Sequence, residues 1–129
     1  MGLATEGSMS AGERRVAPPL NGDVEHHGNR SDRHARVARL ATAFGAESAD
    51  LLARSTVGVV GAGGTGSPAI EVLARAGVGH IIVVDPDTFS VSNLERVHGS
   101  TDADTTATSS KVMIAYRHAA SINPKIQFT

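Results

Sequence analysis

The stretch that decides the fold runs from residue 55 to residue 85 and reads STVGVVGAGGTGSPAIEVLARAGVGHIIVVD. Two short apolar runs in it, 56–60 and 80–84, have the composition of buried parallel strands. The segment between them, 67–76, carries apolar residues at helical spacing. Its proline falls in the first helical turn, where the missing amide is not needed. The sequence therefore predicts a strand, a glycine turn, a helix and a second strand.

The six residues between the first strand and the helix form a glycine-rich turn, Gly61-Ala62-Gly63-Gly64-Thr65-Gly66. Its position between a strand and a helix is typical of a turn that binds phosphates. We expect Gly61 to make the tight turn and Gly66 to let helix and strand pack closely. Gly63 and Gly64 would let the backbone approach phosphate oxygens. The exposed amides at the helix N-terminus then favour an anion.

A carboxylate follows the second strand. Asp85 stands where a carboxylate can accept hydrogen bonds from ribose hydroxyls. The alternative is a structural glycine turn with a surface aspartate. Because strand, turn, helix, strand and acid occur in this order, the sequence favours a nucleotide-binding site.

The residues before the first strand divide into two parts. Residues 1–31 are polar and glycine-rich, with little periodic apolar content, and bury too little surface to offset their ordering entropy. We predict a disordered tail there, and its pair His26-His27 has no partner ligands, so no metal site is predicted. Residues 32–54 show helical spacing interrupted at Gly45, which predicts two short helices.

Beyond Asp85 the sequence predicts a polar loop over 86–109, a helix over 110–121 and the opening of a third strand over 125–129. Alternating strands and helices predict an α/β fold, a Rossmann-like doubly wound sheet. Two strands and part of a third make only the N-terminal half of such a sheet. We therefore expect a partial nucleotide-binding domain over 32–129.

The composition narrows the class of protein. The chain has 129 residues, a formal net charge of -1, 40% hydrophobic residues and no cysteine. The near-balanced charge offers no basic surface for nucleic acid and no polybasic membrane contact. Without cysteine this stretch can form neither disulfides nor thiolate zinc sites, and no apolar run approaches the roughly 20 residues that span a bilayer. These features favour a cytoplasmic protein.

Residues after the second strand discriminate between two cofactors, because a dehydrogenase and an adenylating enzyme both use a glycine turn. Asp87, Asn93, Arg96 and Lys111 bring polar and cationic groups toward the carboxyl edge of the sheet. An arginine and a lysine around a triphosphate would stabilise the charge that develops as pyrophosphate leaves. A hydride-transfer site has no such need. The loop therefore favours ATP over a dinucleotide.

Together these motifs form a pattern known from one protein family. Residues 57–97, with their Gly-Ala-Gly-Gly-x-Gly, Val-Asp-x-Asp and Ser-Asn-Leu-x-Arg motifs, closely resemble the ThiF/MoeB-type adenylyltransferases, whose core fold is shared with ubiquitin-activating enzymes. The resemblance continues through SSKVMIAYRHAASINPKIQF at 109–128 and includes RVARLATAFG at 36–45. It covers about residues 33–129.

The resemblance implies a role for each matching residue. The four turn glycines would hold the ATP phosphates, Asp85 the ribose, and Asp87 would lie beside the nucleotide. Asn93 would contact phosphates together with the residues implied to be catalytic. Arg39 would reach the triphosphate of a neighbouring protomer, so the resemblance implies a homodimer. The implied catalytic residues are Arg96, Lys111 and Arg39, with Lys111 near the α-phosphate.

The resemblance also implies the reaction. Members use ATP and Mg²⁺ to adenylate the C-terminal carboxylate of a ubiquitin-like or sulfur-carrier protein. The magnesium-binding aspartate of the family falls beyond Thr129, so these residues alone are expected to be inactive. The chain departs from the family at Val97-His98-Gly99, where many members have glutamine after the arginine. It departs again at the TSSK segment, 108–111, where G-x-x-K is commoner.

Alternatives remain at this point. One is an NAD(P)-binding Rossmann oxidoreductase, in which Asp85 would select NAD. Another is a non-catalytic module that docks a ubiquitin-like partner. Individual residues also have simpler interpretations: Asn93 as a turn residue, and Arg96 and Arg39 as solvated surface charges. For His80, His98 and His118 the sequence favours surface or packing roles.

Overall fold

The computed structural model describes the backbone of residues 27–129 and the side chains of 32–129. No helix among these residues has both the length and the apolarity to cross a membrane. The elements in chain order are α1 (His27–Arg36), α2 (Ala38–Phe44), α3 (Ala46–Arg54), β1 (Thr56–Val60), α4 (Gly66–Arg75), β2 (His80–Val84), the 3-10 turn η1 (Val91–Asn93), α5 (Asp102–Thr106), α6 (Lys111–Ile122) and β3 (Gln127–Phe128).

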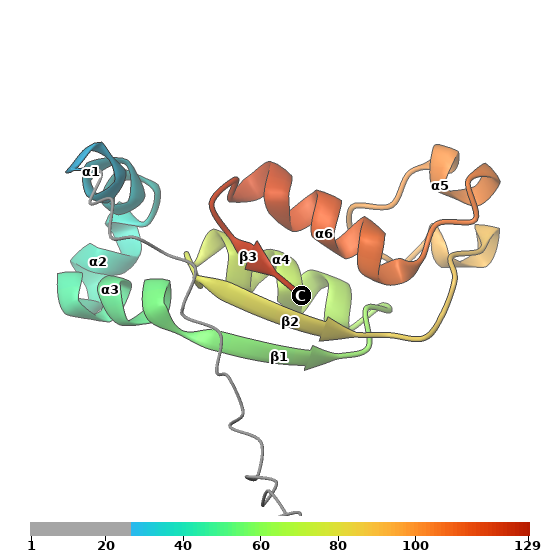
Figure 1. Ribbon diagram of the computed structural model, residues 1–129, viewed down its shortest axis with the longest axis horizontal. Helices are drawn as coiled ribbons and strands as arrows, with labels where there is room; N and C mark the ends of the chain where they lie inside the picture. Colours follow the sequence, from blue (N-terminus) through green and yellow to red (C-terminus); the bar gives the residue numbers. More distant parts are fainter. Residues whose placement is uncertain (1–26) are drawn as a thin grey trace, which may run out of the picture.

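The centre of the molecule is a three-stranded parallel sheet in the order β1-β2-β3. β1 pairs with β2 from Thr56↔His80 to Val60↔Val84, and β2 pairs with β3 at its start. Both strands predicted in full, 56–60 and 80–84, are confirmed. α4 and α6 make the two crossovers and lie on the same face of the sheet (Figure 1). The two crossovers thus build one half of a doubly wound sheet.

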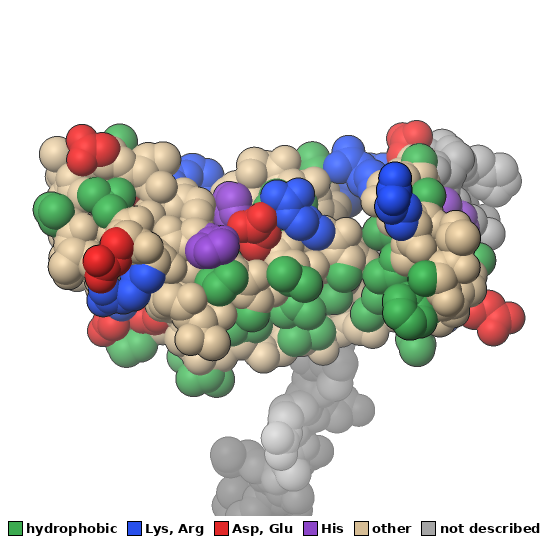
Figure 2. All heavy atoms as spheres, turned by 180° about the vertical axis from the view of Figure 1, so that it is seen from behind, with side chains coloured by type: hydrophobic (Ala, Val, Ile, Leu, Met, Phe, Trp, Pro, Cys, Tyr) green, Lys and Arg blue, Asp and Glu red, His purple; other side chains and the backbone are tan. Residues whose placement is uncertain are grey.

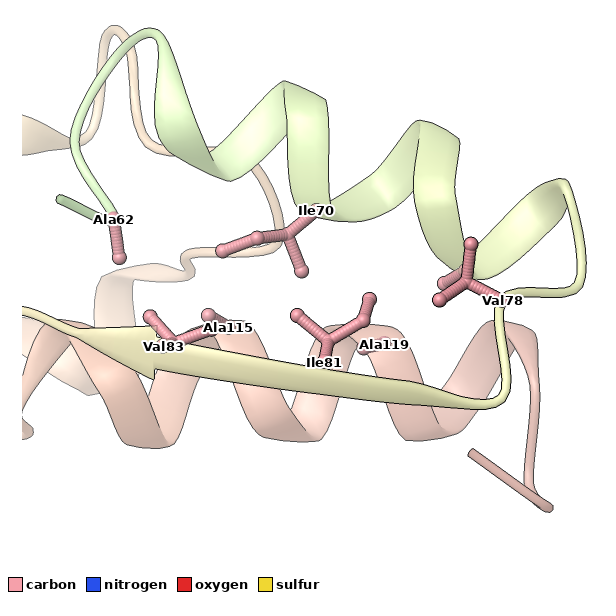
Figure 3. Close-up of a cluster of buried hydrophobic side chains, with 8 residues drawn as sticks. Ala62, Ile70, Val78, Ile81, Val83, Ala115 and Ala119 are labelled. Carbon is pink, nitrogen blue, oxygen red and sulfur yellow. The ribbon is translucent and has the colours of Figure 1, made fainter. Parts of the chain in front are cut away.

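The core lies between that face and the two crossover helices. Figure 3 shows Ile70 of α4 pointing toward Ile81 and Val83 of β2, with Ala115 and Ala119 of α6 against the same strand. The small alanines let α6 approach β2 closely, and the branched side chains fill the space. This cluster fixes α4, and with it the glycine turn that precedes α4.

The opposite face of the sheet is exposed among the described residues. Val60 is 90% exposed and Val84 59%, and Ile82 is also exposed. These side chains alternate with buried ones in β2 and with partly buried ones in β1, as the two-residue period of a strand requires. Parallel sheets are normally covered on both faces, so this face agrees with the prediction of an incomplete sheet.

In the described residues before β1, from residue 27 onward, there are three helices rather than the two predicted. The predicted first helix is divided at Val37, whose side chain is buried beside Gly77. α1 begins at His27, inside the segment predicted as a tail. Sequence periodicity missed this start because α1 lacks an apolar stripe, and its end is held by polar contacts: His34 pairs with Asp50 at 3.0 Å. Residues 1–26 of the predicted tail, which include His26, lie outside the described residues.

The predicted polar loop after β2 is more ordered than its composition indicates. Phe89, Val97 and Ile114 form a second buried cluster, with Leu94 packed against it. An antiparallel bridge between Thr88 and Ser110 closes the base of this segment. The sequence missed α5 because its five residues, DADTT, carry no apolar periodicity. Hydrogen bonds at its start define it instead.

A buried carboxylate holds α5 against α6. The Asp104 side chain is only 3% exposed and accepts two hydrogen bonds of 2.8 Å from the Arg117 guanidinium. It also accepts bonds from the amide and hydroxyl of Thr101. The Arg117 hydrogen bonds, followed by those of Thr101, hold the pKa of Asp104 well below its usual range. The carboxylate therefore stays charged at neutral pH.

We predict that Asp104→Asn lowers the free energy of unfolding by about 2 kcal/mol at pH 7, because the charged acceptor of a buried network is lost. Since the folded-state pKa is depressed, the stabilisation is complete above about pH 4 and is lost as the pH falls below that value. Urea unfolding between pH 2 and pH 7 measures both effects. The free energy of unfolding should change less with pH in the variant than in the wild-type protein.

The control for this prediction is Asp102→Asn, which removes an exposed carboxylate from the same helix. It should change the free energy of unfolding by less than about 0.5 kcal/mol. Equal effects of the two substitutions would contradict a special role for Asp104.

Candidate functional site

The glycine turn joins β1 to α4 at the carboxyl edge of the sheet. Gly61 has a φ of 92°, a left-handed conformation that glycine adopts readily, and its amide donates to the carbonyl of Val84 at 2.8 Å. A Cβ atom on Gly66 would lie 1.7 Å from the carbonyl oxygen of Gly61. No side chain fits there, so the close approach of helix and strand expected at Gly66 is present.

The outer side of the turn is open. A Cβ atom on Gly63 would meet nothing within 4 Å. In the described part of the chain, the amides of Gly63, Gly64 and Thr65 donate to no protein group. They precede α4, a ten-residue helix whose dipole is positive at this end. Unpaired amides at a helix N-terminus fit an anion such as a phosphate group.

Asp85 ties the end of β2 to this turn. One carboxylate oxygen accepts a 2.6 Å hydrogen bond from the Ala62 amide, and the other accepts one of 2.8 Å from the Asp87 amide. The residue is half-buried. A carboxylate oxygen can accept two hydrogen bonds, so Asp85 keeps acceptor capacity for a sugar hydroxyl. Asp85 thus lies beside the turn, and its contact with a ribose stays a prediction.

Lys111 and Asp87 form the second part of the site. The ammonium group lies 2.6 Å from an Asp87 carboxylate oxygen, and the Lys111 side chain is only 12% exposed. The Lys111 amide also donates to the Asp87 carbonyl at 3.2 Å. A lysine at the start of a helix is disfavoured by the dipole, and the ion pair offsets this cost. The structure therefore brings together two residues that lie 24 positions apart.

Arg96 lies against the glycine turn. A Cβ atom on Gly64 would be 3.2 Å from the Arg96 side chain. The guanidinium donates to the Ser92 carbonyl and the Glu95 carboxylate, both at 2.9 Å, and remains 49% exposed. The aliphatic part of the Arg96 side chain thus lies beside Gly64 of the turn, and its guanidinium is within reach of solvent.

Asn93 has a structural role in this site. It is buried, and its side-chain oxygen accepts a 3.2 Å hydrogen bond from the Ser90 amide in a capping box. The backbone carbonyl of Asn93 accepts from Arg96 and Val97. The turn interpretation of Asn93 therefore holds in the structure, whereas a phosphate contact stays a prediction.

Arg39 is not with these residues. It is exposed on α2, which lies at the end of the sheet where the strands begin (Figure 1). The glycine turn lies at the opposite end. Within one chain Arg39 is therefore separate from the site, and a role across a protomer boundary stays a prediction. Among the described residues no group of three His, Cys, Asp or Glu side chains could hold a metal ion.

A cavity of about 630 Å³ also lies at the end where the strands begin, lined by basic residues that include Arg33, Arg54 and Lys125. None of the glycine-turn residues contributes to it. Phosphate binding depends on exposed amides rather than on an enclosed volume, so we place the functional site at the turn.

Sequence reasoning missed a polar cluster behind the turn. Glu71 accepts hydrogen bonds from His98 Nδ1 at 3.0 Å and from His118 Nε2 at 2.9 Å, and it pairs with Arg75. Figure 2 shows histidine side chains beside an acidic and a basic side chain on this face. The bonds from His118, His98 and Arg75, in that order, lower the pKa of Glu71 to about 2. The available signal was the helical spacing of Ser67, Glu71 and Arg75.

The ThiF family matches residues 34–129 of this chain. The chain is 40% identical over 93 residues to the tRNA threonylcarbamoyladenosine dehydratase of Bacillus subtilis, covering 71% of this chain and 35% of that protein. It is 39% identical over 83 residues to the sulfur carrier protein adenylyltransferase of Thermus thermophilus, covering 64% and 30%.

A solved structure of E. coli tRNA N6-threonylcarbamoyladenosine dehydratase in complex with ATP superposes with a TM-score of 0.69 and 31% identity. The match covers 74% of this chain and 39% of that one. The chain thus spans about a third of the length of each of these proteins.

We predict that Gly66→Ala lowers the free energy of unfolding by about 3 kcal/mol, because the added methyl group overlaps the Gly61 carbonyl. Gly63→Ala is the matched control: it adds the same methyl group in open space and should change stability by less than about 0.5 kcal/mol. Thermal unfolding of both variants tests the difference. Equal melting temperatures would contradict the close approach at Gly66.

Proposed function

This chain belongs to the ThiF family, and on that basis we propose that it is the nucleotide-binding part of an ATP-dependent adenylyltransferase. One observation carries the proposal. The glycine turn has unpaired amides and the Arg96 side chain against its Gly64, and Lys111 is held at the same edge of the sheet by its ion pair with Asp87, two residues after Asp85. Turn amides bind phosphate in many nucleotide sites, but two added cations suit a triphosphate that is cleaved.

Each residue takes a role that its position supports. The glycines Gly61, Gly63, Gly64 and Gly66 shape the surface on which the phosphates lie. Asp85 accepts from the ribose. Arg96 and Lys111 neutralise the phosphates, and Asp87 holds Lys111 in place until the nucleotide binds. Asn93 fixes the loop that carries Arg96.

The proposed reaction is acyl adenylation. A carboxylate oxygen of the protein substrate attacks the α-phosphorus of ATP, a new P–O bond forms, and the bond to the β-phosphate oxygen breaks. The products are an acyl-adenylate and pyrophosphate. Negative charge moves onto the leaving pyrophosphate, and cations that stabilise this charge lower the barrier. Lys111 and Arg96 supply that stabilisation in the proposal.

The proposed substrate is the C-terminal carboxylate of a ubiquitin-like or sulfur-carrier protein. The relative from Thermus thermophilus is named for a sulfur carrier protein, and a Dictyostelium discoideum relative for a ubiquitin-like modifier. We also propose a cytoplasmic homodimer in which Arg39 serves the partner's site. Mg²⁺ would accompany the ATP phosphates, and no step is assigned to it because the described residues offer no set of ligands.

A second candidate substrate comes from the relative named for a tRNA nucleoside. Activation of a carboxyl group on such a nucleoside would use the same ATP site. The net charge of -1 favours a protein substrate over RNA. The NAD(P) alternative is not favoured, because relatives are named as adenylyltransferases and a similar structure holds ATP.

ATP–pyrophosphate exchange on the complete gene product tests the proposal, with candidate sulfur-carrier proteins, ubiquitin-like proteins or tRNA added separately. We expect exchange that depends on a carrier protein. Arg96→Ala and Lys111→Ala should each lower the exchange rate by about 100-fold, because a group that stabilises developing charge is lost.

The charge-matched control is Lys125→Ala, at the opposite end of the sheet, which should leave exchange unchanged. If pyrophosphate exchange depended on tRNA instead, the substrate would be the tRNA nucleoside and not a carrier protein. Binding of NADH without any exchange would refute the adenylation proposal.

The proposed role of Arg39 predicts complementation between two inactive variants. In a symmetric dimer, mixing Arg39→Ala with Arg96→Ala would give mixed dimers in which one of the two sites has every residue intact. After random exchange of subunits, roughly a quarter of the wild-type activity should return. No recovery, with dimers shown to exchange, would place Arg39 outside the partner's site.

A further inference from the structure

The loop that follows Arg96 is attached to both crossover helices by side chains that the proposed reaction does not use. These are Ser67 and Glu71 of α4, His98 of the loop and His118 of α6, which we call the histidine clamp. We propose that the histidine clamp positions Arg96 over the glycine turn and thereby sets the affinity for the phosphates of the nucleotide. This inference rests on the proposed function, which assigns Arg96 to those phosphates.

Ser67 provides the first link. Its side chain is buried, with 2% exposure. The hydroxyl donates to the Gly63 carbonyl at 2.8 Å and accepts from the His98 amide at 2.9 Å. One oxygen atom therefore joins the glycine turn to the backbone two residues after Arg96. A buried hydroxyl with both functions satisfied is costly to remove.

Glu71 provides the second link. Its carboxylate lies one helical turn after Ser67 and accepts from His98 on the loop and His118 on α6 through the same oxygen. Gly99, with a φ of 77°, passes over the His118 ring: a Cβ atom there would lie 2.3 Å from it. The loop is thus held between α4 and α6.

Arg96 lies inside the restrained segment. On one side, the amides of Arg96 and Val97 donate to the Asn93 carbonyl, and Val97 is buried in the second cluster. On the other side, His98 and Gly99 are held by the histidine clamp. A long side chain keeps a productive position only when the backbone beneath it is fixed. The contact between Arg96 and Gly64 is the result.

The contacts of the residues that follow Arg96 give each of them a role. The chain continues with Val97-His98-Gly99. Here valine enters the second core and histidine reaches Glu71. The described residues contain no set of three metal ligands, so these histidines have no assigned metal. Positioning is the role that their contacts support.

Two pairs of variants test the inference on the complete gene product. His98→Asn keeps a nitrogen donor at the position of Nδ1, whereas His98→Leu removes it. His118→Gln keeps a donor at the position of Nε2, whereas His118→Leu removes it. The His98 side chain is 51% exposed, so its substitutions leave the fold intact.

Hydrogen exchange of the segment 94–100, measured without nucleotide, reports the position of the loop directly. We expect faster exchange in both leucine variants and near wild-type exchange in the amide variants. The leucine variants should raise the Kd for ATP about tenfold, and the amide variants should restore it. Unchanged hydrogen exchange of residues 94–100 in the leucine variants would overturn the inference.

A double-mutant cycle shows whether the effect passes through Arg96. In an Arg96→Ala background, His98→Leu should have no further effect on the Kd for ATP. Additive effects would overturn the inference, because the clamp would then act by another route. The proposed function fails separately if the leucine variants bind ATP more weakly than the wild-type protein but the wild-type protein catalyses no pyrophosphate exchange.

Discussion

No side chain fits between Gly66 and the carbonyl of Gly61, and the rest of the site depends on this contact. Because α4 begins directly against the end of β1, its first turn and the amides before it lie at the carboxyl edge of the sheet. The apolar core then holds α4 at this place through Ile70 and Ala74. Asp85 completes the arrangement by bonding the end of β2 to the turn. The close approach at Gly66 thus places the unpaired amides of the turn at the edge of the sheet, where they can bind an anion.

The cations of the site are paired before any ligand binds. Lys111 is held by Asp87, and Arg96 by Glu95 and the Ser92 carbonyl. Lys111 begins α6 and Arg96 lies against the turn that precedes α4, and a positive charge at either place is disfavoured by the helix dipole. These ion pairs differ in burial: Lys111 is largely shielded, whereas Arg96 is half exposed. A nucleotide phosphate could therefore replace Glu95 as the partner of Arg96 at low cost. Lys111 would contribute a charge that is already oriented by Asp87.

The sequence predicts this fold well where a single physical rule dominates. The strands at 56–60 and 80–84 follow from apolar composition, and the glycine turn and Asp85 follow from spacing. The sequence predicts less where several distant residues cooperate. α5 depends on Asp104, whose partner Arg117 lies on α6, 13 positions along the chain. The break at Val37 depends on a contact with Gly77. Glu71 and the two histidines come from three segments, and only the folded chain shows that they share one carboxylate.

The bridge between Thr88 and Ser110 divides this part of the chain into residues whose positions are fixed and a loop that can vary in length. Residues outside it, Asp87 and Lys111, are held to each other by backbone and side-chain bonds whatever lies between them. Residues 90–109 form an excursion that is closed at its base, and its Leu94 and Val97 pack against Phe89 and Ile114 outside it. Insertions between α5 and α6 would lengthen a surface loop at little entropic cost and leave both Arg96 and Lys111 in place. The fold can therefore diversify the surface beside its nucleotide site, where a substrate would dock, while the site itself stays constant.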